Sequence, residues 1–290
     1  MNTQVHTIMQ KKQLSETVFR MEVFAPLIAE ARLPGQFIIL QTDEEYGERI
    51  PLTIGNANPD TGSITLIFQV VGKTTRQLST FETGDTLPVL VGPLGKPTTI
   101  EKVGHVVCVC GGIGAAPMYP IAEALKKAGN RVTVIQGARN GELLILDSLF
   151  GQLAHRHIIV TDDGSKGQKG LVTEPLELLC ASANPPDMVI AIGPPVMMRA
   201  CSETTRPFAI HTQVSLNSIM VDGTGMCGGC RVTVGGRTQF VCVDGPEFDG
   251  HLVDWPNMIN RLTTYKNTEG NKLKCFVESA IASTEIKQPA

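Results

Sequence analysis

The stretch that most constrains this chain lies near its C-terminal end, where three cysteines and one aspartate are spaced among glycines. Four residues separate Asp222 from Cys227, and two separate Cys227 from Cys230. Eleven more separate Cys230 from Cys242. A plant-type 2Fe–2S cluster is held by a C-x4-C-x2-C run and a distant fourth cysteine. The spacing is kept here with an aspartate in the first position, so we expect a 2Fe–2S cluster on these four residues.

The glycines of this loop support the same interpretation, because residues without Cβ permit positive φ and close approach of backbone N–H groups to sulfide. They are Gly223, Gly225, Gly228 and Gly229. The alternatives are a zinc site on the three cysteines, or buried thiols without metal. No histidine lies between His211 and His251 to complete a zinc site. If Asp222 is only a turn residue, the fourth ligand would be Cys201 or Cys275.

Composition excludes several classes of function. The chain has 290 residues, enough for two or three domains, and a net charge of −3 gives no basis for nucleic-acid binding. No apolar run of about 20 residues could span a membrane, and residues 1–12 do not form a signal peptide. Five of the eight cysteines lie outside the cluster spacing and are expected to be small buried hydrophobic residues. We expect a cytoplasmic protein whose cysteines stay reduced.

The pattern of residues 1–100 predicts an antiparallel β-barrel. Residues 19–23 alternate between apolar and polar side chains, and residues 36–40 form a compact apolar run. A turn at 58–62 leads into a long strand over 63–71. Short strands at this spacing are typical of a closed barrel.

Two turns in this region carry groups that could bind an anion. Arg49 and Thr53 flank the rigid Pro51 near a strand end. The run Gly72-Lys73-Thr74-Thr75 follows the long strand and offers backbone N–H groups and hydroxyls. Taken alone, each is more often a surface turn with a solvated charge.

Strands and helices alternate from residue 101 to 215. Residues 106–110 form an apolar run typical of a parallel strand buried on both faces, and a glycine turn then leads into a helix over 117–128. Further strands are expected at 131–135, 157–161, 188–192 and 208–214, and further helices at 142–150, 173–181 and 195–201. This alternation predicts a doubly wound parallel sheet.

The carboxyl ends of these strands predict a nucleotide site, because ligands bind doubly wound sheets at that edge. The glycine-bearing strand ends are residues 111–116, 137–139, 162–164 and 193–194. The first of these turns precedes a helix, so its backbone N–H groups are expected to face a phosphate.

Residues 216–290 combine the cluster loop with an extension. Trp255, Ile259 and Leu262 are expected on a short helix, which would either cap the cluster loop or bind another chain. The chain is thus predicted to contain three domains: an antiparallel β-barrel (1–100), a nucleotide-binding α/β domain (101–215) and a 2Fe–2S domain with a C-terminal extension (216–290).

Taken together, these motifs resemble the ferredoxin reductase superfamily. They are R-x-P-L-T, G-x-x-T, G-G-x-G-x-x-P, T-D-D-G-S, G-P-x-x-M and the cluster run. The chain is similar to electron-transfer subunits of dihydroorotate dehydrogenase. It is more similar to small subunits of electron-bifurcating NADH-dependent ferredoxin:NADP oxidoreductase, also called sulfide dehydrogenase. Asp222 and the stretch from Asp244 to Trp255 favour the second group, whose cluster is held by one Asp and three Cys.

The resemblance implies FAD, NAD(H) and a 2Fe–2S cluster as cofactors. FAD would be bound by Arg49, Pro51, Leu52, Thr53, Gly72, Lys73 and Thr75. NAD(H) would be bound by Gly111, Gly112, Gly114, Arg139, Asp162, Asp163, Gly193 and Pro194. Two positions depart from the family pattern: Thr74 stands where relatives often have Gly, and Ile192 where they often have Cys.

The resemblance further implies reversible electron transfer from NAD(H) through FAD and the cluster to a partner. Hydride carries two electrons and the cluster takes one at a time, so FAD must split the pair, and no general acid or base is required. The expected partner is a larger, glutamate-synthase-like flavin and iron–sulfur subunit of a heteromeric complex, through which ferredoxin would be reached. The alternatives are a dihydroorotate dehydrogenase subunit with the same cofactors, or a non-catalytic nucleotide sensor. Arg139 could meet a 2′-phosphate or stack on adenine; the resemblance favours NAD.

Overall fold

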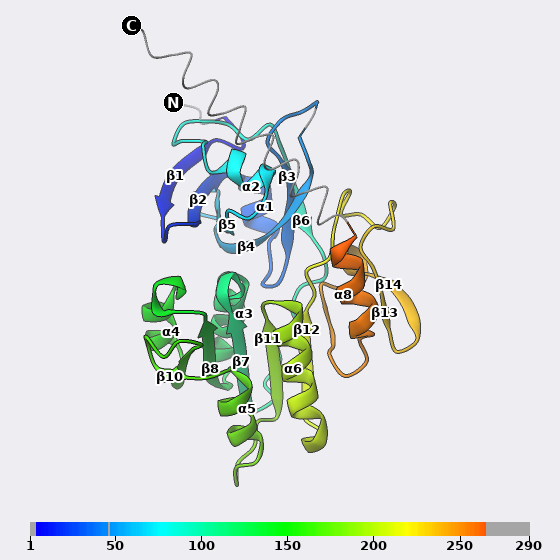
Figure 1. Ribbon diagram of the computed structural model, residues 1–290. Helices are drawn as coiled ribbons and strands as arrows, with labels where there is room; N and C mark the ends of the chain where they lie inside the picture. The colour runs from blue at the N-terminus through cyan, green and yellow to red at the C-terminus, as the bar shows by residue number, and fades with distance from the viewer. Residues whose placement is uncertain (1–3, 46, 265–290) are drawn as a thin grey trace, which may run out of the picture.

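The computed structural model describes residues 4–45 and 47–264, which form two sheets and a separate hairpin. An antiparallel sheet lies above a mostly parallel sheet in Figure 1, and the C-terminal segment lies beside both. This is the predicted fold class: a barrel, a doubly wound sheet and a C-terminal cluster segment.

The barrel contains six strands in which every neighbouring pair is antiparallel. In spatial order they are β1 (Ile8–Gln13), β2 (Val18–Phe24), β5 (Ser63–Gln69), β4 (Ile50–Asn58), β3 (Phe37–Gln41) and β6 (Val89–Leu94). The residues before β6 close the barrel against β1, because the N–H of Ile8 donates to Asp85 O at 2.8 Å. Alternate side chains such as Met21, Ile38 and Leu66 fill the interior with no exposed surface.

The second sheet has seven strands, of which the last in spatial order is antiparallel to its neighbour. The order is β10 (Gln168–Lys169), β9 (Arg156–Thr161), β8 (Arg131–Ala138), β7 (His105–Gly111), β11 (Met188–Ile192), β12 (His211–Ser215) and β15 (Glu247–Asp249). Its α-helices are α3 (Ala115–Lys127), α4 (Asp147–Leu153), α5 (Thr173–Cys180) and α6 (Pro195–Thr205). Short 3₁₀ turns are η1 (Gly112–Gly114), η2 (Gly141–Leu143) and η3 (Arg206–Phe208).

Strand β7 is buried on both faces, as its unbroken apolar run predicts. Val107 and Val109 pack in one core with residues of α5 and α6. Cys108 and Cys110 pack in a second core with residues of α3 and α4. The sheet therefore lies between two helical layers. The four described cysteines outside the cluster spacing, Cys108, Cys110, Cys180 and Cys201, are buried and free, as expected; Cys275 lies outside the described residues.

Three local details differ from the predicted elements. The helix expected at 142–150 is replaced by η2 and a later α4, because Leu146 adopts a positive φ of 60° between them. The strand expected from 208 begins at His211, since η3 and the positive φ of Ala209 come first. The barrel also carries two short helices that the pattern did not predict, α1 (Pro26–Ala31) and α2 (Lys73–Leu78).

The C-terminal segment forms a hairpin of β13 (Arg231–Val234) and β14 (Arg237–Phe240), followed by α7 (Val241–Asp244), β15 and α8 (Trp255–Thr263). Because β15 pairs with β12 in the second sheet, the cluster loop is inserted between two neighbouring strands. The division into three domains remains a prediction.

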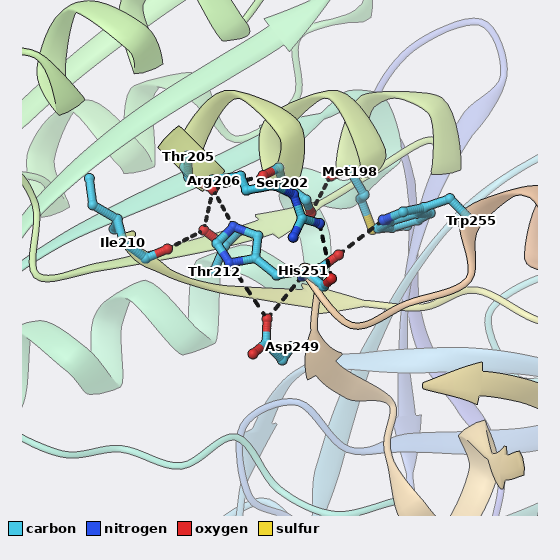
Figure 2. Close-up of polar contacts among 10 residues, drawn as sticks. Met198, Ser202, Thr205, Arg206, Ile210, Thr212, Asp249, His251 and Trp255 are labelled. Carbon is cyan, nitrogen blue, oxygen red and sulfur yellow. Dashed lines mark hydrogen bonds and ion pairs between the residues drawn. The ribbon is translucent and has the colours of Figure 1, made fainter. Parts of the chain in front are cut away.

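A partly buried polar seam ties the chain after β15 to α6 (Figure 2). His251 Nε2 lies 2.9 Å from Thr205 Oγ1, and Arg206 donates to the carbonyl of His251 at 2.9 Å. Trp255 Nε1 donates to Gly250 O at 3.0 Å and is itself buried. These hydrogen bonds thus fix the chain after β15 to the second sheet.

No helix among the described residues is both long enough and apolar enough to cross a membrane.

Candidate functional site

A cavity of about 1080 Å³ lies between the barrel and the carboxyl edge of the second sheet. It is lined by eleven of the residues predicted to bind FAD or nucleotide: Pro51, Leu52, Thr53, Thr75, Gly111, Gly112, Gly114, Arg139, Asp162, Gly193 and Pro194. Four predicted residues do not line it: Arg49, Gly72, Lys73 and Asp163. The fold therefore brings the two predicted cofactor sets to one continuous space.

On the barrel side, Arg49 directly precedes β4, whose first residues line the cavity. Its Nε is buried and has no hydrogen-bond partner, which is unusual for a guanidinium and fits an anionic ligand. Thr75 Oγ1 accepts hydrogen bonds from the N–H groups of Val71 and Gly72, each at 3.0 Å, and so shapes the start of α2. Lys73 is the half-buried first residue of that helix.

The glycine turn after β7 combines two physical requirements. Gly112 has a φ of +53°, and a Cβ there would meet nothing within 4 Å. A Cβ on Gly114 would lie 2.2 Å from the carbonyl oxygen of Ile192, which belongs to β11. Gly112 thus leaves open space, whereas Gly114 permits close packing of the turn on the neighbouring strand.

At the ends of β8 and β9, two adjacent aspartates have different surroundings. Asp162 lines the cavity together with Arg139. Asp163 Oδ1 instead accepts hydrogen bonds from the N–H and hydroxyl of Ser165, at 2.9 and 2.6 Å, and these bonds lower the pKa of Asp163. Ser165 Oγ in turn accepts from the N–H of Gly141, so Asp163 serves to join the two loops.

One wall of the cavity is formed by residues that the sequence patterns did not predict. The segment that leaves β12, together with the residue before β15, supplies Ser215, Leu216, Asn217, Ser218, Met220 and Pro246. Ligands bind doubly wound sheets at the carboxyl ends of the strands, and β12 is one of these strands. Applied to β12, this principle predicts residues 215–218 as part of the site. Pro246 comes from pairing of β15 with β12, for which the sequence carried no signal.

The four predicted cluster ligands lie in two pairs. Cys227 Sγ lies 3.4 Å from Asp222 Oδ1, and Cys230 Sγ lies 3.2 Å from Cys242 Sγ. In the described part of the chain, no three Cys, His, Asp or Glu side chains converge on one point that would hold a single metal ion. A zinc site needs three or four converging ligands, whereas each iron of a 2Fe–2S cluster takes two. The two observed pairs match the two ligands per iron that a 2Fe–2S cluster needs.

Asp222 also closes the loop that carries it. Its carboxylate accepts hydrogen bonds from the N–H groups of Thr224, Met226 and Cys227 at 2.8–3.1 Å. Although burial acts to raise it, these bonds and the Cys227 thiol lower the pKa of Asp222 to about 2. The turn role considered as an alternative is therefore observed, and the ligand role remains a prediction. Cys201 is fully buried on α6 and joins neither pair.

The cluster loop adjoins the cavity. Met220 lines the cavity and is separated from Asp222 by a single residue. Gly223 has a φ of +74°, and a Cβ there would lie 2.7 Å from Leu94 Cδ1 and 2.8 Å from Ile39 Cγ1 of the barrel. On the other side, Cys227 and Met226 are exposed, Met226 to 89%. The loop thus connects the buried cavity wall with the protein surface.

A barrel and a parallel sheet that share a cavity beside a loop of paired metal ligands define a ferredoxin reductase-like oxidoreductase. Residues 108–203 match the oxidoreductase NAD-binding domain. Residues 217–254 match the iron-sulfur cluster binding domain of dihydroorotate dehydrogenase B.

Similar proteins are found among curated sequences and solved structures. The chain is 44% identical over 278 residues to the dihydroorotate dehydrogenase B (NAD(+)) electron transfer subunit homolog of Thermotoga maritima, covering 96% of this chain and 98% of that protein. It is 43% identical to a chain of the NADH-dependent reduced ferredoxin-NADP oxidoreductase structure, described for flavin-based electron bifurcation. That match has a TM-score of 0.89 and covers 96% of this chain and 100% of that one.

A ferredoxin NADP+ reductase from Neisseria gonorrhoeae shares the fold alone, at 18% identity and a TM-score of 0.57, over 70% of this chain and 89% of that one. The chain belongs to the family of dihydroorotate dehydrogenase B electron transfer subunits and their homologues.

Proposed function

We propose that this chain transfers electrons between NAD(H) and a partner subunit by way of FAD and a 2Fe–2S cluster bound by Asp222, Cys227, Cys230 and Cys242. The observation that carries the proposal is the contact between the shared cavity and the cluster loop. Residues from the barrel and from the sheet edge line one space, and Met220, just before the cluster loop, lines it as well. Gly223 of the loop lies close to Leu94 and Ile39 of the barrel.

Bound FAD would supply the conversion of a two-electron hydride from NADH into single electrons, which a one-electron cluster requires. The residues of this chain supply binding and orientation. Arg49, with its unpartnered buried Nε, would bind the flavin pyrophosphate. Gly112 leaves space for the nucleotide phosphates at the start of α3, where backbone N–H groups favour an anion. Gly72 and Lys73 do not line the cavity, but they lie at the start of α2 beside Thr75, which does. From there they would bind the flavin.

The proposed partner is a larger, glutamate-synthase-like flavin and iron–sulfur subunit, as in NADH-dependent ferredoxin:NADP oxidoreductase, with ferredoxin reached through it. The 43% identity to a chain of that enzyme over 96% of this chain supports the proposal, as does the aspartate in the first ligand position. The second candidate is the electron-transfer subunit of dihydroorotate dehydrogenase, which the match of residues 217–254 supports. The chain that co-purifies with this protein decides between them.

The electron path can be tested on the chain reconstituted with FAD, iron and sulfide under anaerobic conditions. NADH should bleach the flavin absorbance and then produce the EPR signal of a reduced 2Fe–2S cluster. In Cys230→Ser the flavin should still bleach, because this residue does not line the cavity, but the cluster signal should be lost. Flavin that NADH does not reduce, or a cluster signal that survives in Cys230→Ser, would contradict the proposal.

A further inference from the structure

Helix α8 lies outside the matched iron–sulfur domain but packs on its cluster loop. The match ends at residue 254, and α8 begins at Trp255. Trp255 and Met258 are buried, and a cavity of about 320 Å³ separates the helix from the loop. Its lining includes Cys227 and Gly229 from the loop and Arg261 from the helix. The helix lies beside the cluster loop (Figure 1) and contacts it through Arg261, as the capping role requires, while binding of another chain remains a prediction.

Two arginines donate to adjacent carbonyls of the cluster loop. Arg261, from α8, donates to Gly229 O at 3.1 Å, and Arg231, from β13, donates to Gly228 O at 3.1 Å. Gly229 stands between Cys227 and Cys230 in the chain, and its N–H donates to Cys227 Sγ at 3.4 Å. Each guanidinium group thus binds the carbonyl of a residue that is next to a predicted ligand in the chain: Gly228 follows Cys227, and Gly229 precedes Cys230.

The two arginines differ in their exposure to solvent. Arg231 is exposed, whereas Arg261 is half-buried between α8 and the loop. Among the described residues, Arg261 has no carboxylate within ion-pair distance. No carboxylate of the described residues therefore neutralises its positive charge, and its partial burial limits screening by water.

We propose that Arg261 tunes the cluster, raising its midpoint potential and so favouring electron transfer from the flavin. Reduction adds one negative charge to a 2Fe–2S cluster, and net charge and hydrogen bonding near the cluster set its potential. A fixed, half-buried cation beside the loop stabilises the reduced form more than the oxidised form. The inference rests on the proposed cluster, and it makes α8 a source of redox tuning as well as a structural cap.

The test is a redox titration of the reconstituted chain monitored by EPR, with iron content measured in each variant. Arg261→Gln should lower the midpoint potential, and Arg261→Lys, which keeps the charge, should restore most of it. A tenfold decrease in the equilibrium constant for one-electron reduction of the cluster would lower its midpoint potential by about 59 mV. Arg231→Gln should shift the potential less, because that charge is exposed. Arg237→Gln, an exposed charge at the far end of the same hairpin, is the matched control and should not shift it.

The outcomes separate this inference from the proposed function. A wild-type chain that assembles no cluster would contradict the proposed function itself. A normal cluster in Arg261→Gln with an unchanged potential would overturn only the tuning role, as would equal shifts in Arg261→Gln and Arg261→Lys. Arg261→Met is a second neutral variant whose unbranched side chain suits the helix. If both neutral variants lose the cluster, Arg261 serves the fold of the loop, and the tuning proposal is wrong.

Discussion

Asp222 shows how one side chain can serve both a local turn and a predicted metal site. Its two carboxylate oxygens accept three backbone hydrogen bonds and also lie beside Cys227 Sγ. A cysteine in this position would supply a thiolate but would accept those backbone hydrogen bonds less well, since sulfur is a weak acceptor. If each pair binds one iron, one iron takes an oxygen and a thiolate while the other takes two thiolates, which should make the two irons unequal.

The ligand role of Asp222 predicts a spectroscopic change. Asp222→Cys should keep a 2Fe–2S cluster while altering its EPR spectrum and midpoint potential, because one oxygen ligand becomes sulfur. Cys201→Ser, which changes a buried thiol on α6, should leave the spectrum as it is. An unaltered spectrum with full iron content in Asp222→Ala would show that Asp222 only closes the turn.

Glu247 is an unusual carboxyl group at the junction of the barrel and β15. Its Oε1 accepts a hydrogen bond from Thr98 Oγ1 at 2.7 Å, but its Oε2 is buried without a partner. Burial raises the pKa of Glu247 from its ordinary value of 4.5 to about 7, against the opposing effect of the Thr98 bond. The folded chain therefore retains a proton that the unfolded chain releases.

This shift predicts a loss of stability with rising pH. Because the folded pKa is the higher one, the free energy of unfolding should fall between about pH 4.5 and pH 7, by on the order of 3 kcal/mol, and stay low above it. Glu247→Gln should remove this loss and be the more stable form at pH 8. Urea unfolding of both proteins at pH 5.5 and 8 measures the effect. An identical pH dependence in the two proteins would refute it.

At the scale of elements, the seam between α6, β12 and the chain after β15 contains a chain of hydrogen bonds (Figure 2). Thr205 Oγ1 lies 2.6 Å from Thr212 Oγ1 and 2.9 Å from His251 Nε2. Burial lowers the pKa of His251, so the imidazole is neutral at physiological pH and can share a hydrogen bond with a hydroxyl. Thr205 thus connects α6 to β12, the next strand along the chain, and to His251, which is distant in sequence.

Removing this hydroxyl should weaken the seam. Thr205→Val keeps the shape of the side chain but leaves Thr212 and His251 without their shared partner in a buried site. We expect a loss of about 1–3 kcal/mol in the free energy of unfolding. Thr204→Val is the control on the same helix, because the hydrogen bond of Thr204 Oγ1 among the described residues goes to Ala200 O, one turn away. Equal losses in the two variants, measured by urea unfolding, would show that the seam contributes nothing.

At the scale of the whole molecule, the sequence predicts best those features that depend on local pattern. The unbroken apolar run of β7 and the glycines that follow it indicate a buried parallel strand and its turn, and both are observed. The spacing of the four predicted ligands indicates a single cluster site; their side chains lie in two pairs in the structure, and their role as ligands remains a prediction. These features are fixed by residues close together in the chain.

The features that escaped prediction depend on contacts between distant segments. Strand β15 has only three residues, and its pairing with β12 depends on how the cluster loop folds. Arg49 and Thr53 lie in one short segment, yet only Thr53 lines the cavity, because the closure of the barrel decides which way each faces. The different surroundings of Asp162 and Asp163 follow from Ser165 and Gly141, which no periodicity reveals.

The position of β15 at the edge of the second sheet affects the newly made chain. Without β15, strand β12 would present a row of unpaired backbone groups, and such an edge is a template for aggregation. A ribosome adding roughly 5–20 residues per second needs a few seconds to proceed from β12 to β15. During that interval the nascent sheet is open on this side, and the whole cluster loop must be made before the chain can protect it.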